Sequence, residues 1–214
     1  MSSGTTGQQG FDTNYDQGIA LRFFIQQMLN DVQTVALVKI VGVSNNSGLS
    51  SVGTVDVQPL VNQMTGDRRA VPHGVIHKIP YFRLQGGRNA IILDPQIGDI
   101  GMCGFCSRDS SAVIANKDFG NPGSFRKFDW ADGLYFGGFL NGTPSQYIRF
   151  SESGIDLVSP TKITLDAPEV EVTGKLTVTG VIKSLTDVLA KAISLLGHKH
   201  GSVQSGDKMT GDPQ

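Results

Sequence analysis

Residues 153–180 read SGIDLVSPTKITLDAPEVEVTGKLTVTG, and this stretch decides the fold class. Pro160 and Pro168 stand eight residues apart, and Gly174 and Gly180 replace proline at the later turns. Each unit carries two apolar residues two positions apart, which lie on one side of an extended chain. The four pairs are Ile155 and Leu157, Ile163 and Leu165, Val170 and Val172, and Leu176 and Val178. Short strands between regularly repeated turns predict a β-solenoid.

A few such turns cannot form a closed core within one chain. Each strand buries only two side chains, and roughly 25 cal/mol per Å2 of apolar surface does not offset the entropy lost on ordering. Three copies wound around a common axis would bury every apolar pair centrally. We therefore expect an intertwined trimeric β-helix, a shaft, over residues 147–182. Ordinary hairpins packed on the preceding domain are the alternative.

Upstream of the shaft, residues 35–115 have the pattern of a small β-domain. The expected strands lie in TVALVKIVGVS (34–44), VGTVDVQPLV (52–61), VIHKIPYFRLQGG (75–87, broken at Pro80) and AIILDPQIGDIGMCGFCSRD (90–109, two strands). About five short strands, each closed by glycine or proline, predict a barrel of the OB-fold type. Residues 116–146 are interpreted as a connector with a hairpin around DWADGLYFGG (129–138).

The N-terminal segment, residues 1–34, is expected to be a polar arm followed by one helix. Asp16 is a suitable N-cap for GIALRFFIQQMLNDVQ (18–33), which is apolar around most of its surface. A short helix of this kind must bury that surface somewhere. It either packs on the β-domain or docks to another subunit.

Composition narrows the class of protein. The chain has 214 residues, 27 of them glycine, with 39% hydrophobic residues and a net charge of -1. These values favour a soluble, turn-rich β protein and give no electrostatic case for nucleic acid or an anionic membrane. No secretory signal or transmembrane run is expected.

Cys103 and Cys106 are interpreted as two reduced packing residues, because neither a helix start nor further zinc ligands accompany them.

The C-terminal segment, residues 183–214, is expected to be an apex that binds metal. His198 and His200 form H-K-H, and in an extended strand both imidazoles face the same side. Three chains around an axis would supply six nitrogens, an octahedral set that favours iron over structural zinc. The preceding run SLTDVLAKAISLLG (184–197) is either a short helix or a further strand. His73 and His77 are interpreted as surface or packing residues.

With these residues in view, the chain resembles the central membrane-piercing spike proteins of contractile phage tails. The similarity is closest to the lysozyme-free branch whose N-terminal domain is an OB-fold. It is carried by VGTVDVQPLVNQ (52–63), IPYFRLQGGRNAIILDPQIGDIGMCGFCSRDSS (79–111), FDWADGLYFGG (128–138) and the apex-like tail HKHGSVQSGDKMTGDP (198–213).

The resemblance implies a structural virion protein, not an enzyme. It implies a homotrimer at the tail tip of the virion, assembled in the bacterial host cytoplasm. Its base would sit on a baseplate hub or tail-tube protein at the N-terminal end. Its apex would bind one iron ion per trimer through His198 and His200 of three chains, and would contact the host outer membrane during injection.

Two other functions compete with piercing. An OB-fold that binds nucleic acid needs a basic groove with exposed aromatic residues. The chain offers only Tyr81, Phe82, Arg83 and Arg88, opposed by Asp94, Asp99 and Asp109. An enzyme is the third possibility, but no hydrolase, metalloprotease or phosphate-loop motif is present. Asp129 and Asp132 around Trp130 resemble a carbohydrate site only superficially.

Overall fold

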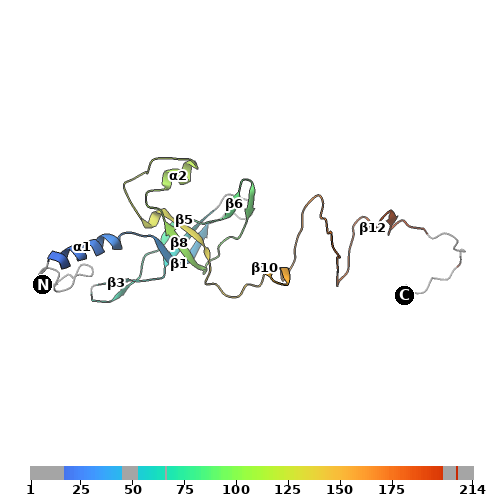
Figure 1. Cartoon of the computed structure of the whole chain (residues 1–214), viewed down its shortest axis with the longest axis horizontal. Coiled ribbons are helices and arrows are strands. Elements are labelled where there is room, and N and C mark those ends of the chain that lie inside the picture. The colour runs from blue at the N-terminus through green and yellow to red at the C-terminus, as the bar shows by residue number, and fades with distance from the viewer. Residues whose placement is uncertain (1–16, 45–52, 66, 200–205, 207–214) are drawn as a thin grey trace. The chain divides into compact units, whose positions relative to one another are not determined.

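The structure of the chain, a computed structural model, describes residues 17–44, 53–65, 67–199 and 206. It is mainly β, as the sequence predicts, and divides into two compact units, Met1–Pro144 and Ser145–Gln214 (Figure 1). The helices of the first unit are α1 (Gln17–Asn30), α2 (Ser111–Asn116) and the 3-10 helix η1 (Trp130–Asp132). Its strands are β1 (Val35–Ser44), β2 (Thr54–Pro59), β3 (Gln63–Met64), β4 (Ala70–Val71), β5 (Ile76–Pro80), β6 (Leu84–Gly86), β7 (Asn89–Ile91), β8 (Ile100–Phe105) and β9 (Gly133–Gly138).

Five of these strands form one curled antiparallel sheet in the order β5-β2-β1-β8-β9. Its two edges meet, because Tyr81, just after β5, bridges Tyr135 in β9, and Phe82 N donates to Tyr135 O at 2.7 Å. The sheet is therefore a curled half-barrel. Its core is small and consists of Val38, Ile40, Val55, Val57, Ile79, Tyr81, Cys103 and Tyr135.

The central strands form where the sequence alternates between apolar and polar residues. In β2, every second residue is buried, and Val55 and Val57 point into the core. The pairing of β8 with β9 also depends on one glycine. A Cβ atom at Gly101 would lie 2.0 Å from the carbonyl oxygen of Gly137, so only glycine allows this approach.

The expected connector over residues 116–146 differs from what the structure shows. Part of it belongs to the sheet, since β9 pairs with β8 through Cys103↔Tyr135 and Gly104↔Leu134. The expected hairpin around residues 129–138 is instead η1 followed directly by β9. The β-domain therefore continues beyond residue 115, because the last sheet strand follows a long loop.

The predicted N-terminal helix is confirmed as α1. Ala20, Phe23 and Gln27 are half-buried, and no residue of the helix is fully buried. Its other apolar side chains, including Phe24 and Met28, are exposed. The helix thus has one side toward its own unit and an apolar side in solvent. The arm over residues 1–15 lies outside the described residues.

The second unit contains two hairpins. Strands β10 (Tyr147–Ser151) and β11 (Gly154–Val158) pair with each other, as do β12 (Leu189–Ala190) and β13 (Ile193–Ser194). Residues 159–188, all of which are described, form no helix or strand within the single chain.

Residues 184–197 form neither of the two alternatives, a short helix or a further extended strand of the shaft, but the small hairpin β12–β13. Asp187 Oδ1 accepts hydrogen bonds from Val188 N at 2.8 Å and Leu196 N at 3.0 Å, so it ties the two ends of the hairpin together. Lys191 has φ 55°, which gives the left-handed turn between β12 and β13. Two such local carboxylate bonds favour a turn over a helix.

Candidate functional site

The most informative surface of the second unit is one face of the β10–β11 hairpin. Ile148 lies opposite Leu157, and Phe150 lies opposite Ile155, so all four side chains share a face. They are respectively 62%, 50%, 75% and 67% exposed. We name these four residues the hairpin face. It is an apolar face that has no cover within the described chain.

The opposite face of the same hairpin is polar. Arg149 lies opposite Asp156, and its guanidinium contacts that carboxylate at 2.5 Å and 2.8 Å. Tyr147 and Val158 pair beside them. A hairpin with an ion pair on one side and four apolar residues on the other has a defined inner and outer side.

The exposed apolar pattern continues past the hairpin. The paired residues of the repeat, predicted to face a common axis, are all exposed in the single chain: Ile163, Leu165, Val170, Val172, Leu176 and Val178. Contiguous apolar surface of this extent marks an interaction site. Because every residue from 160 to 186 is exposed in one copy, exposure does not distinguish the predicted inward positions from their neighbours.

Of the two predicted metal ligands, only His198 lies among the residues that the structure describes. His198 follows β13, and its Nδ1 lies 3.1 Å from the carbonyl oxygen of Leu195. A carbonyl only accepts, so Nδ1 carries the proton and Nε2 holds the lone pair in the neutral ring. This arrangement suits a ligand whose second nitrogen is fixed by the backbone. His200 lies outside the described residues. Among the residues that are described, no group of three or more His, Cys, Asp or Glu side chains could hold a metal.

A buried ion-pair cluster in the first unit was not predicted. Arg126 donates to Asp132 Oδ2 from Nε at 2.6 Å and to Asp109 Oδ1 from a terminal nitrogen at 2.8 Å. The side chains of Asp109 and Asp132 are only 3% and 1% exposed. Ser111 and Ser124 also donate to Asp109. We name these residues the Arg126 cluster.

The carboxyl groups of the Arg126 cluster are held in the charged form. Hydrogen bonds from Ser111 and Ser124, together with the charge of Arg126, lower the pKa of Asp109 to about 2. The hydrogen bond from Arg126 lowers the pKa of Asp132, against the opposing effect of burial. With both acids ionised and partnered, the cluster is a structural brace rather than an acid–base pair.

The structure also gives roles to the two aspartates that were compared with a carbohydrate site. Asp132 belongs to the brace, and Asp129 caps η1 by accepting from Ala131 N at 2.8 Å. Neither carboxylate is placed as a carbohydrate-site pair. No local sequence signal reveals the cluster, because Arg126 lies 17 residues from Asp109 in the chain.

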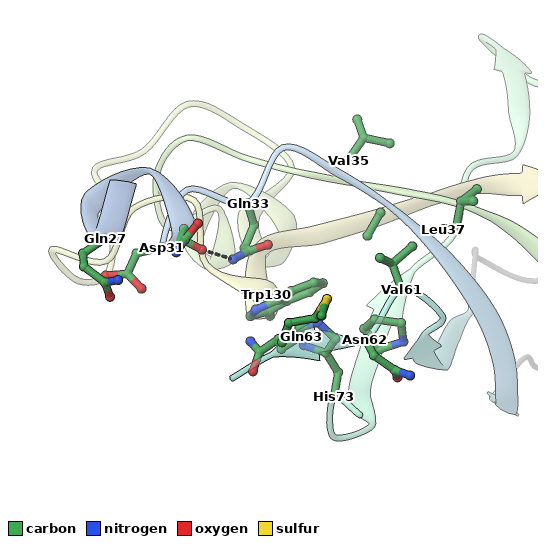
Figure 2. Close-up of a pocket in the computed structure, with 14 residues that line it drawn as sticks. Gln27, Asp31, Gln33, Val35, Leu37, Val61, Asn62, Gln63, His73 and Trp130 are labelled. Atoms are coloured by element: carbon green, nitrogen blue, oxygen red, sulfur yellow. Dashed lines mark hydrogen bonds between the residues drawn. The ribbon is translucent and has the colours of Figure 1, made fainter. Parts of the chain in front are cut away.

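A pocket of about 700 Å3 lies between the end of α1, the start of β1 and the segment that follows β2. Figure 2 shows Trp130 and His73 together at its centre, with Gln63 and Asn62 beside them. The Trp130 ring is fixed by ring contacts with His73 at 5.0 Å and Phe105 at 4.9 Å. His73 is thus a packing residue. His77 is exposed and lies 3.0 Å from Asp56, which makes it a surface residue.

Of the residues considered for a nucleic-acid groove, Tyr81 and Arg83 are engaged within the chain, whereas Phe82 and Arg88 are exposed. Arg83 donates to Asp94 at 2.6 Å, and Tyr81 OH donates to the same carboxylate oxygen at 2.7 Å. The Arg83 side chain is only 5% exposed. It therefore stabilises the edge of the sheet and does not present its charge to solvent.

The two cysteines have different surroundings. Both are free thiols, and only Cys103 packs in the core, where burial raises its pKa to about 12. Cys106 is exposed, so the interpretation of a packing role is wrong for this residue. It follows the end of β8, where the chain leaves the sheet.

Comparison with known proteins adds no family to these observations. No helix within the described ranges is both long and apolar enough to cross a membrane. No protein-family model matches the chain, and no curated protein matches it.

Proposed function

We propose that this chain is one subunit of a homotrimeric spike at the tip of a contractile phage tail. The trimer pierces the host outer membrane during injection. It comprises an OB-fold base, an intertwined β-helical shaft over residues 147–182 and a metal-capped apex over residues 183–214.

The observation that carries this proposal is the hairpin face. Four large apolar side chains on one side of β10–β11 are exposed, while Arg149 and Asp156 pair on the other. Burying one such side chain contributes about 1.5–3 kcal/mol, so the face favours association strongly. Three copies around an axis cover the hairpin face and the repeat pairs below it together, with the ion pairs outward.

The N-terminal end is the attachment point of the proposed spike. The curled sheet forms the base, and the solvent side of α1 carries Leu21, Phe24 and Met28. Arg22 is the one charged residue between positions 17 and 30. An apolar helical side of this kind fits a groove in a baseplate hub or tail-tube protein.

The apex holds one metal ion, iron, through His198 and His200 of each chain. The Leu195 carbonyl orients His198 with Nε2 as the nitrogen that binds, which is the orientation such a site requires. Six imidazoles fill the coordination sphere and leave no open position for a substrate. The ion's role is to prevent fraying at the chain ends, where disorder otherwise concentrates.

The proposed role is mechanical and not enzymatic. A wound trimer resists axial force because all three chains must come apart together. The protein acts in the virion, at the tail tip, after assembly in the host cytoplasm.

The test is the native mass of the purified full-length chain, measured together with its metal content. We expect a mass about three times the 22.8 kDa of one chain and one iron per three chains. A stable monomer with an intact fold would contradict the spike. Metal bound at one ion per chain would contradict the shared apex.

A further inference from the structure

The loop between α2 and η1 presents an aromatic residue to solvent on a rigid support. Phe125 is fully exposed, at 103%, and Phe119 in the same loop is 93% exposed. Both neighbours of Phe125 are anchored to one carboxylate: Ser124 donates to Asp109 at 2.7 Å and Arg126 at 2.8 Å. The Arg126 cluster therefore holds the side chains of both residues that flank Phe125, while the ring itself is exposed to solvent.

A fixed, exposed aromatic side chain is suited to binding. Little conformational entropy remains to be lost when its backbone is already ordered, and aromatic anchors dominate the energetics of interfaces. The Arg126 cluster ties the loop to the sheet, and in doing so it holds the two residues that flank Phe125. A receiving pocket on another molecule would give the exposed ring of Phe125 a partner.

The pocket around Trp130 has the matching chemistry. Its apolar wall includes Val35, Val61 and Trp130. Its edge is lined by Gln27 of α1 and by Asp31, which directly follows the helix. Asp31 is the one carboxylate among the described residues that line the pocket.

One polar atom of the pocket also lacks a partner. The side-chain nitrogen of Gln27 is buried and makes no hydrogen bond to any described residue. An unpaired buried donor costs about 1–3 kcal/mol, and rotation of the Gln27 side chain toward the pocket would let it donate to a backbone carbonyl of an occupant. An occupant with a carbonyl, an aromatic ring and a cation would satisfy Gln27, Trp130 and Asp31 together.

We infer that Phe125 of one copy inserts into the Trp130 pocket of the neighbouring copy, head to tail around the three-fold axis. The segment SFRK (124–127) supplies the ring, backbone carbonyls and the exposed cation Lys127, which complements Asp31. A ring that is fully exposed does not fill the pocket of its own chain. A contact between two different surfaces of one chain closes into a ring when three copies surround an axis.

This inference rests on the proposed trimer and adds a second interface to it, in the base rather than the shaft. The shaft brings three bases together at high effective concentration, so a modest contact suffices to lock them. The base would then be rigid against twisting where force enters the spike.

The first test uses the single tryptophan of the chain, Trp130. Acrylamide quenching of its fluorescence is measured on the full-length protein, with native mass recorded for each sample. Phe125→Ala is expected to raise the quenching constant and shift emission to longer wavelength, while the trimer mass stays unchanged. Phe139→Ala, which removes another exposed phenylalanine of the first unit, is the matched control and should change neither value.

The second test asks whether the segment in the Trp130 pocket comes from a second copy of the chain. Phe125→Cys and Val61→Cys are combined in a Cys106→Ser background, so that no other exposed thiol of the described chain competes. Oxidation should join three chains covalently, seen as a trimer on a denaturing gel without reductant. Either cysteine alone should leave single chains.

The outcomes separate this inference from the proposed function. A wild-type trimer whose Trp130 quenching is unaffected by Phe125→Ala overturns the base contact and leaves the spike standing. Altered quenching without the covalent trimer overturns the second copy as occupant. A monomeric wild-type protein overturns the spike itself, and the base contact with it.

Discussion

The guanidinium of Arg126 lies against the carboxylate of Asp132, with Nε 2.6 Å from Oδ2, at the point where the chain re-enters the sheet. The backbone oxygen of Asp132 accepts from Cys106 N at 3.0 Å, and its side chain accepts from Ser110 N at 2.8 Å. Asp132 thus ties together the end of β8, the start of the long loop and the start of β9. Arg126 neutralises this junction and extends it to Asp109.

Replacing Arg126 with methionine is expected to lower the stability of the first unit markedly. The change leaves two buried carboxylates without their cation, which is the costly half of breaking a buried ion pair. Thermal unfolding followed by circular dichroism should show a lower midpoint, and limited proteolysis should cut within residues 106–128.

Arg149→Met is the matched control for that experiment. It removes an arginine–aspartate pair whose side chains are largely exposed, and such pairs contribute at most about 1 kcal/mol. Equal loss of stability in the two variants would contradict the bracing role of Arg126.

The Arg126 cluster also makes the stability of the first unit decrease in acid. The pKa of Asp109 falls from 3.8 to about 2 because Ser111 and Ser124 hydrogen-bond its charged form, and that of Asp132 is also lowered. Between about pH 4 and pH 2 the unfolded chain therefore binds more protons than the folded one, and the free energy of unfolding falls as the pH falls. Urea midpoints across this range should fall steeply in wild type and less steeply in Asp109→Asn. Parallel slopes would exclude Asp109 as a source of the dependence.

The sequence predicts the first strands of the sheet, but it assigns the residues of the last strand, β9, to a hairpin in the connector. Strand β2 follows from apolar residues at every second position, β1 from a nearly continuous run of β-branched and apolar residues, and β8 from a short apolar run after a turn. Strand β9 reads GLYFGG, and three glycines obscure its period. It enters the sheet through close approach to Gly101, a contact between residues far apart in the chain. Such tertiary contacts override local pattern.

For the candidate sites too, the sequence reveals local patterns and does not reveal contacts between distant segments. The hairpin face follows from residues two apart, which a sequence displays directly. The Arg126 cluster and the Trp130 pocket do not, because their members come from separate segments that only the fold brings together. Residues 184–197 fit either period, and two hydrogen bonds to Asp187 decide for the hairpin.

Gly101→Ala should weaken the pairing of β8 with β9. The added methyl group would lie 2.0 Å from Gly137 O, so the strands must separate, at a cost of about 2 kcal/mol or more. Chemical denaturation measures the loss. Gly86→Ala is the control, because no atom lies within 4 Å of a Cβ placed there. Similar midpoints for the two variants would show that β9 does not depend on this approach.

Ile155→Asp should prevent assembly of the shaft. If the hairpin face surrounds a three-fold axis, the change buries three like charges together without partners. Native mass should fall from trimer to monomer.

Val158→Asp is the control for the shaft, since Val158 lies on the opposite side of the same strand, across from Tyr147. It should remain trimeric. A trimeric Ile155→Asp protein would place the hairpin face outside the interface.

The apex metal should depend on His198 and His200 and on their neutral form. Replacing both with alanine is expected to abolish the metal measured by elemental analysis, while native mass stays trimeric because the apolar shaft is a separate interface. Lys199→Ala, which alters the residue between them, should retain the metal. Imidazole binds metal only when deprotonated, so occupancy in wild type should fall on acidification. Unchanged metal content in the double variant would place the ion elsewhere. A double variant that became monomeric would mean that the metal, and not the hairpin face, holds the three chains together.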